Sequence, residues 1–163
     1  MSKLSFRVAV PGDEQTILDF ICALAEYEHL SDQVVATRSL LREWIFEKKK
    51  AEVLFALEEG REVGFALFFH NFSTFLGRAG IYLEDLFVLP EYRGKGYGKG
   101  LLKKLAAIAV ERGCGRLEWA CLDWNKPSIE FYTKRMQAVP MDEWTVYRLT
   151  GDPLMEAAKE DEP

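Results

Sequence analysis

The chain has 163 residues and a formal net charge of −5. Its hydrophobic content of 48% and aromatic content of 13% suffice for one substantial core, so we expect one folded domain rather than disorder. The negative charge argues against nucleic acid as the main partner, because binding its backbone requires a concentrated basic face. No apolar run approaches the ~20 residues that cross a bilayer, and residues 1–10 lack the apolar core of a signal peptide. We therefore expect a cytoplasmic protein that makes no membrane contact.

The cysteines do not suggest metal or disulfide chemistry. Cys22, Cys114 and Cys121 are an odd number without CxxC spacing, and only two histidines accompany them. Cys22 falls on an apolar helical face and Cys121 in an expected strand, so both are interpreted as small buried hydrophobes. We expect no metal site and no covalent cysteine mechanism.

Alternating and helical patterns divide the first half of the chain. Residues 4–10 alternate with the period of a strand, and Pro11-Gly12-Asp13 ends this strand and offers a cap for a helix that ends near residues 27–29. Thr37 is expected to cap a second helix. The apolar stripe of that helix consists of Leu40, Leu41, Trp44 and Ile45. Two helices therefore separate the first strand from the second.

The rest of the chain alternates between strands and helices. Residues 53–57 and 62–69 are predicted strands joined by a tight turn at Glu59-Gly60, residues 71–80 a loop, and residues 81–89 a long central strand. Further strands are expected over 116–122 and 144–149, and a helix over 125–136. The order predicts a mixed α/β fold in one domain over residues 1–150, followed by an acidic tail over 151–163.

The segment from Tyr82 to Gly100 has the composition of an anion-binding turn. An apolar strand ends at Pro90, a run with alternating glycines follows Arg93, and an amphipathic helix begins at once. Glycine loses more chain entropy on folding than other residues, so this run needs a compensating role. A strand, a glycine loop and a helix N-terminus together expose backbone N–H groups that suit a phosphate.

Two common phosphate loops do not fit this run. Gly98-Lys99 is followed by Gly100 where the Walker pattern needs Ser or Thr. The dinucleotide pattern G-x-G-x-x-G fails from Gly94 and from Gly96. The run does match R-x-x-G-x-G over Arg93 to Gly98, and it resembles the diphosphate loop of the GNAT superfamily of N-acetyltransferases.

A second motif supports this resemblance. Asn125 to Tyr132 reads N-x-P-S/A-x-x-F-Y, which resembles the segment that in these enzymes closes over the pantetheine arm and offers a tyrosine to the thioester sulfur. The stretches LAEYE, YLEDLFV, WNKPSIEFY and DEWTVYRL are similar to the spermidine/spermine N1-acetyltransferase family over nearly the whole chain. The resemblance implies a GNAT fold with a mixed central sheet of about six to seven strands and about four helices. It also implies a homodimer and acetyl-CoA as co-substrate.

The resemblance implies three groups of site residues. The catalytic pair is Glu84, which would remove a proton from the amine, and Tyr132, which would protonate the departing thiolate. The coenzyme-binding residues are Leu86, Phe87, Val88, Arg93, Gly94, Lys95, Gly96, Tyr97, Gly98, Lys99, Asn125, Pro127, Ser128 and Tyr132. The amine-binding residues are Tyr27, Glu28, Glu84, Glu143 and Trp144.

The chemistry of the amine acceptor explains why acidic residues are expected in the site. An alkylammonium with a pKa of ~10.4 is not a nucleophile at neutral pH, so the site must help to remove a proton. Asp85 ranks below Glu84 because strand alternation turns it to the opposite face unless a bulge intervenes. One departure is that Met136 and Gln137 occupy the region where the family commonly has a glycine after this helix.

The expected activity is acetyl transfer to a primary amine of a small, polyamine-like cation by direct attack in a ternary complex. Two alternatives stay open at this point: a thialysine or other diamino-acid acceptor, and a non-catalytic coenzyme A-binding regulatory module. Glu84 and Tyr132 favour an enzyme, because a module that only binds needs neither residue.

Overall fold

The computed structural model describes residues 3–160, and it divides the chain into two compact units, residues 1–120 and 121–163. The first unit contains β1 (Leu4–Val8), α1 (Glu14–Tyr27), η1 (Ser31–Gln33), α2 (Arg38–Leu41), the π-helical turn η2 (Arg42–Glu47), β2 (Glu52–Glu58), β3 (Arg61–Ser73), β4 (Arg78–Val88), η3 (Pro90–Tyr92), α3 (Tyr97–Glu111) and β5 (Leu117–Trp119). The second contains α4 (Lys126–Glu130), the π-helical turn η4 (Phe131–Arg135) and α5 (Gly151–Ala157). The domain boundary expected at residue 150 stays a prediction, and residues 161–163 of the expected tail lie outside the described residues.

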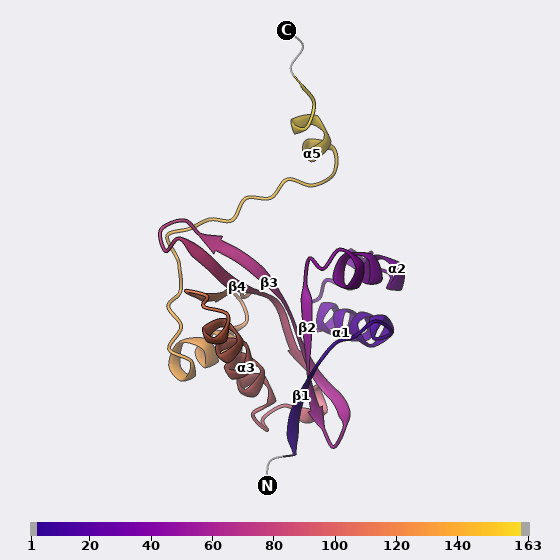
Figure 1. The fold of residues 1–163 in the computed structure, drawn as a ribbon, viewed down its shortest axis with the longest axis vertical. Coiled ribbons are helices and arrows are strands. Elements are labelled where there is room, and N and C mark those ends of the chain that lie inside the picture. The colour runs from indigo at the N-terminus through magenta and orange to yellow at the C-terminus, as the bar shows by residue number, and fades with distance from the viewer. Residues whose placement is uncertain (1–2, 161–163) are drawn as a thin grey trace. The chain divides into compact units, whose positions relative to one another are not determined.

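The first unit is a five-stranded sheet in the order β1-β2-β3-β4-β5. Neighbouring strands are antiparallel except β4 and β5, which are parallel. In Figure 1, α1 and α2 lie on one side of this sheet and α3 lies on the other. The expectation of a mixed α/β fold is confirmed.

Each side of the sheet buries its own apolar layer. The main core cluster consists of Ile17, Phe20, Ile45, Val53, Phe55, Leu57, Phe65 and Phe87. It joins α1 and η2 to β2, β3 and β4, and the Phe20 and Phe65 rings stack at 5.2 Å. From α3, Leu101, Leu102 and Leu105 are fully buried. The fold thus holds β4, which precedes the glycine loop, at the centre of two packed layers.

Several local predictions are confirmed. The β2–β3 turn has positive φ at both Glu59 (50°) and Gly60 (80°), as a two-residue hairpin turn requires. The Thr37 hydroxyl accepts a hydrogen bond from the Leu40 N–H at 3.1 Å and so caps α2. Asp13 precedes α1, but its carboxylate binds Arg7 and the Val10 N–H and does not cap the helix.

The predicted loop over 71–80 is wrong, because β3 and β4 continue as a hairpin to Ser73 and from Arg78. The turn formers act only at its tip, where the Ser73 hydroxyl accepts from the Leu76 N–H and Gly77 has a φ of 68°. Through the rest of this segment, cross-strand pairs such as Phe72 with Ala79 continue the β3–β4 ladder. Pairing therefore overrides the local turn propensity.

The strand predicted over 144–149 is also wrong, and with it the sheet of six to seven strands. Within residues 3–160 this segment belongs to no ladder, although its apolar residues alternate as a strand requires. Its side chains are open to solvent, with Trp144 75%, Val146 82% and Tyr147 91% exposed. A strand needs a neighbouring strand to satisfy its N–H and C=O groups, so alternation alone does not produce one.

Candidate active site

The glycine loop connects the end of β4 to α3 within the first unit. Gly94 and Gly96 have φ values of 78° and 89°, which side-chain-bearing residues rarely adopt. The first helical bond of α3 runs from the Gly100 N–H to the Gly96 carbonyl at 2.9 Å. The amides before Gly100 in the first turn have no intrahelical acceptor, and no described side chain caps them. This arrangement suits a diphosphate, because uncapped N–H groups and the positive end of the helix dipole coincide.

The other two glycines have different surroundings. A Cβ at Gly98 would lie 3.8 Å from Leu86 and 3.9 Å from Val88, which is ordinary contact. A Cβ at Gly100 would lie 2.7 Å from Leu4 Cδ2 and 3.3 Å from Phe6. Gly94 and Gly96 therefore permit the loop conformation, whereas Gly100 permits the close approach of α3 to β1.

A carboxylate of the β2–β3 hairpin anchors the loop. The Tyr97 hydroxyl donates to Glu58 Oε1 at 2.5 Å, and this bond raises the pKa of Tyr97 to about 12. The ammonium of Lys95 lies 3.6 Å from the same oxygen. Sequence reasoning missed Glu58, because nothing in the local pattern connects a strand-end carboxylate to a loop so distant along the chain.

The side chain of Arg93 turns toward α1. Its Nε donates to the Val88 carbonyl at 3.0 Å. Its guanidinium carbon lies 4.7 Å from the ring centre of Tyr27 and 5.0 Å from that of Phe87. The structure thus brings together the start of the loop and Tyr27, one of the predicted amine-binding residues.

A bulge in β4 decides the orientation of the acidic pair. Leu67 of β3 lies opposite Asp85 and Phe68 lies opposite Leu83, so Glu84 is the extra residue. Glu84 is exposed and Asp85 is half-buried. Leu67 packs against the core cluster on the α1 side, and cross-strand partners share a face, so Asp85 faces that side. Asp85 thus shares the α1 side with Phe87, and the bulge changes the alternation only between Leu83 and Asp85.

Two neighbouring carboxylates influence Asp85 there. Burial, followed by the charges of Glu84 and Glu28, raises the pKa of Asp85 to about 6. Burial also raises the pKa of Glu28. Asp85 of β4 and Glu28 at the end of α1 thus both have raised pKa values, which favours a bound cation whose charge would relieve the repulsion.

One edge of β4 is free of strand pairing after Leu83. Among the described residues, β5 pairs only with Ile81, Tyr82 and Leu83, whereas β3 pairs with β4 as far as Val88. Within the described residues, no strand satisfies the backbone groups of Leu86 to Val88 on the β5 side, and the Val88 carbonyl accepts from Arg93 Nε instead. A polar ligand group can bind at such an edge.

The remaining predicted residues belong to the second unit. The Asn125 side-chain oxygen accepts from the Ser128 N–H at 3.4 Å and caps α4, with Pro127 in its first turn. Tyr132 lies in η4, its ring 5.7 Å from that of Phe131. Glu143 and Trp144 lie outside every helix and strand.

Gln137 supplies the conformation that a glycine would otherwise provide. Its φ is 57°, and the Ala138 N–H returns to the Tyr132 carbonyl at 3.0 Å. This is the left-handed residue that commonly ends a helix. The helix ends here without glycine, at a backbone cost of about 1 kcal/mol.

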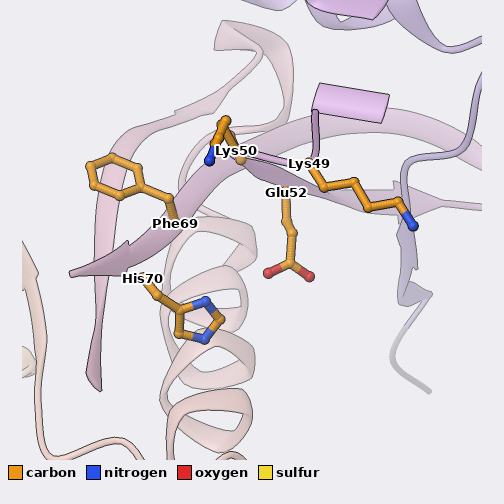
Figure 2. A pocket seen from close by; sticks show the side chains of 6 residues that line it. Lys49, Lys50, Glu52, Phe69 and His70 are labelled. Carbon is orange, nitrogen blue, oxygen red and sulfur yellow. The ribbon is translucent and has the colours of Figure 1, made fainter. Parts of the chain in front are cut away.

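A pocket of about 200 Å³ lies at the start of β2 and the end of β3. It is lined by Lys49, Lys50, Ala51, Glu52, Phe69 and His70. Figure 2 shows Glu52 and His70 pointing to the same side of the strands. Arg112 binds both oxygens of Glu52 at 2.7 and 2.8 Å, and so connects the end of α3 to β2. None of the predicted site residues lines this pocket.

Within residues 3–160, no group of three or more His, Cys, Asp or Glu side chains is arranged to hold a metal ion. In the same part of the chain, no helix is both long enough and apolar enough to span a membrane.

The family model of the acetyltransferase (GNAT) family matches residues 18–136. A thialysine N-epsilon-acetyltransferase of Bos taurus is 40% identical, over 97% of this chain and 99% of that protein. A spermidine/spermine N(1)-acetyltransferase-like protein of Homo sapiens is 29% identical, over 99% of this chain and 24% of that protein. An integron cassette protein from the mobile metagenome of Vibrio cholerae has a similar structure, with a TM-score of 0.77, 29% identity, and coverage of 98% of this chain and 100% of that one.

The chain belongs to the acetyltransferase (GNAT) family, as its first motif predicted. It is an N-acetyltransferase that acetylates an amine. Enzymes of this family use acetyl-CoA.

Proposed function

We propose that this enzyme transfers the acetyl group of acetyl-CoA to a primary amine of a small cationic acceptor, by direct attack in a ternary complex. The observation that carries the proposal is that Asp85, in the strand that leads into the uncapped glycine loop, faces the α1 side, where the charges of Glu84 and Glu28 act on it. One strand thus serves an acid-lined amine site and an anion-binding loop.

The coenzyme would bind through both predicted motifs. Backbone amides from Gly94 to Lys99 would hold the diphosphate, with Lys95 and Lys99 adding positive charge. The free edge of β4 at Leu86 to Val88 would align the thioester and polarise its carbonyl. Asn125, Pro127 and Ser128 would support the pantetheine arm, as the family motif implies.

The amine would bind as a cation and react as a free base. Glu28 and Asp85 would hold the ammonium group beside the face of Tyr27. Glu143 and Trp144 stay predicted amine-binding residues, as the family resemblance implies. Glu84, exposed at the bulge, would take a proton from the nitrogen directly or through water. Tyr132 would donate a proton to the departing thiolate.

The first candidate acceptor is the side-chain amine of a lysine-like amino acid such as thialysine. It is favoured because the thialysine N-epsilon-acetyltransferase similarity covers nearly all of both chains. A polyamine is the second candidate, supported by the spermidine/spermine N(1)-acetyltransferase-like relative. The cytoplasmic location expected from the sequence stays a prediction.

The test is an acceptor panel with acetyl-CoA that measures thiol release for thialysine, lysine, spermidine, spermine, putrescine and a histone peptide. We expect the highest kcat/KM with thialysine. The panel is repeated with Tyr132→Phe, which should bind the coenzyme normally and lower kcat about 10²-fold or more, because the leaving thiolate loses its proton donor.

Each contrary outcome has a distinct meaning. A preference for spermidine would replace the first candidate by the second. Coenzyme binding without turnover of any acceptor would overturn the proposed transfer. Unchanged turnover in Tyr132→Phe would remove its proposed acid role and leave the acceptor assignment intact.

A further inference from the structure

Arg93 connects three parts of the proposed site. Its backbone opens the glycine loop, where the Arg93 N–H donates to the Pro90 carbonyl at 3.3 Å. Its Nε donates to the end of β4 at the Val88 carbonyl. Its guanidinium lies over the ring of Tyr27, the last residue of α1. These contacts direct the side chain toward α1, so the guanidinium is already engaged within the protein.

We propose that Arg93 is a positioning residue that couples the coenzyme loop to the amine-binding end of α1. The inference rests on the proposed function. In this proposal the Arg93 side chain holds Tyr27 and Glu28 in place, whereas the backbone amides of the loop bind the diphosphate.

The contacts of Tyr27 show how such coupling works. Its ring also packs against Phe87 of β4, with ring centres 6.2 Å apart. Glu28 follows directly and is close enough to Asp85 for its charge to raise the pKa of that carboxyl. A force that holds the Tyr27 ring in place therefore also holds one of the carboxylates that would bind the ammonium group.

Arg93 contacts this site through the ring of Tyr27. The charged groups that raise the pKa of Asp85 are Glu84 and Glu28. Because bound diphosphate would order the Arg93 backbone, it would also restrict the guanidinium and fix the end of α1 before the amine arrives.

The test is a double-mutant cycle with Arg93→Met and Tyr27→Leu. Arg93→Met should raise the KM for the best amine about fivefold to tenfold, since it loses the contacts of the guanidinium with the Tyr27 and Phe87 rings and one hydrogen bond. The dissociation constant of coenzyme A, measured by calorimetry, should change less than about twofold. The double variant should match Tyr27→Leu alone, because the two residues act as one unit.

Lys99→Met is the matched control, since it removes another cation of the predicted coenzyme site, in the first turn of α3. It should weaken coenzyme A binding and leave the amine KM unchanged. Arg93→Lys is a second variant that keeps the charge but lacks the guanidinium, and we expect it to behave like Arg93→Met.

The wild type, the two single variants and the double variant are also compared by the midpoint of their urea unfolding, a measurement that needs no substrate. Non-additive midpoints would support the contact between Arg93 and Tyr27, and additive ones would overturn it. A raised coenzyme dissociation constant with an unchanged amine KM would make Arg93 a phosphate ligand and overturn the proposal. If the wild type acetylated no amine, the proposed function would fail and coupled midpoints would reduce Arg93 to a purely structural contact.

Discussion

Burial and the charges of Glu84 and Glu28 all raise the pKa of the Asp85 carboxyl group. Its pKa rises from 3.8 to about 6, so the folded protein disfavours its ionised form relative to the unfolded chain. Because the folded pKa lies above the unfolded one, this group costs stability as the pH rises from about 4 to 6, and the cost persists above that range. A bound ammonium group would offset it.

The Asp85→Asn variant tests whether the ionised Asp85 carboxylate costs stability and titrates in the amine site. The variant should unfold at higher urea concentration than the wild type at pH 7.5, by about 1 to 3 kcal/mol in free energy, and the two should converge near pH 4. The kcat/KM for the amine should fall overall and lose an acid limb with an apparent pKa near 6. The measurements are urea unfolding and a pH profile of kcat/KM.

Glu111→Gln is the control for Asp85→Asn, since it neutralises an exposed carboxylate in the last turn of α3. It should leave the unfolding curve and the pH profile in place. An Asp85→Asn enzyme with the wild-type acid limb would show that another group titrates in the amine site.

At the scale of elements, two glycines near the junction of β4 and α3 have different roles. Gly64 of β3 is buried, and a Cβ there would lie 3.0 Å from the Phe87 carbonyl and 3.2 Å from Val88. Gly98, in the first turn of α3, has room for a Cβ. The first glycine serves packing between sheet and helix, whereas the second lies where the coenzyme would approach.

Replacing each glycine by alanine should distinguish the role in packing from the role in coenzyme binding. Gly64→Ala should lower the free energy of unfolding by about 1 to 3 kcal/mol, because the adjacent carbonyl cannot move without breaking the ladder. Gly98→Ala should be neutral or gain up to about 1 kcal/mol, because alanine suits a helix better. It should nevertheless weaken coenzyme A binding.

Urea unfolding and calorimetry on the two glycine variants give both comparisons. Equal stability losses would contradict the separation of duties. Normal coenzyme binding by Gly98→Ala would show that the first turn of α3 does not approach the ligand closely.

At the scale of the whole molecule, the apolar segment over 144–149 suggests how two chains associate. It alternates like a strand, and Trp144, Val146 and Tyr147 are largely exposed. Unpaired backbone groups and exposed apolar side chains favour pairing with another chain. We therefore propose a homodimer, as the resemblance implied, with this segment at its interface.

Light scattering should give twice the 18.7 kDa chain mass. Val146→Asp should shift the enzyme toward the single-chain mass, because an aspartate in an apolar interface loses its hydration. Val110→Asp is the matched control: Val110 on α3 is 78% exposed, close to the 82% of Val146, and its change should leave the mass unaltered. A single-chain mass for the wild type, or a persistent dimer in Val146→Asp, would contradict the proposal.

The sequence by itself determined the features that depend on short-range chemistry. The Glu59-Gly60 turn, the Thr37 cap and the cap at Asn125 each follow from a backbone or side-chain preference within a few residues. The R-x-x-G-x-G run indicated the family, because its glycines permit a loop conformation that few other residues adopt. Apolar periodicity also identified β4 as a central strand and α3 as the helix that follows it.

Only the tertiary structure decided what depends on pairing between distant segments. The bulge at Glu84 arises from the register between β3 and β4, and the raised pKa of Asp85 arises from its burial and the charges of Glu84 and Glu28. Glu58 reaches the loop, and Arg93 reaches Tyr27, because the sheet and α1 bring remote parts of the chain together. The segment over 144–149 forms no strand in this chain for the same physical reason: a strand requires a partner for its backbone hydrogen bonds, and its own sequence cannot supply one.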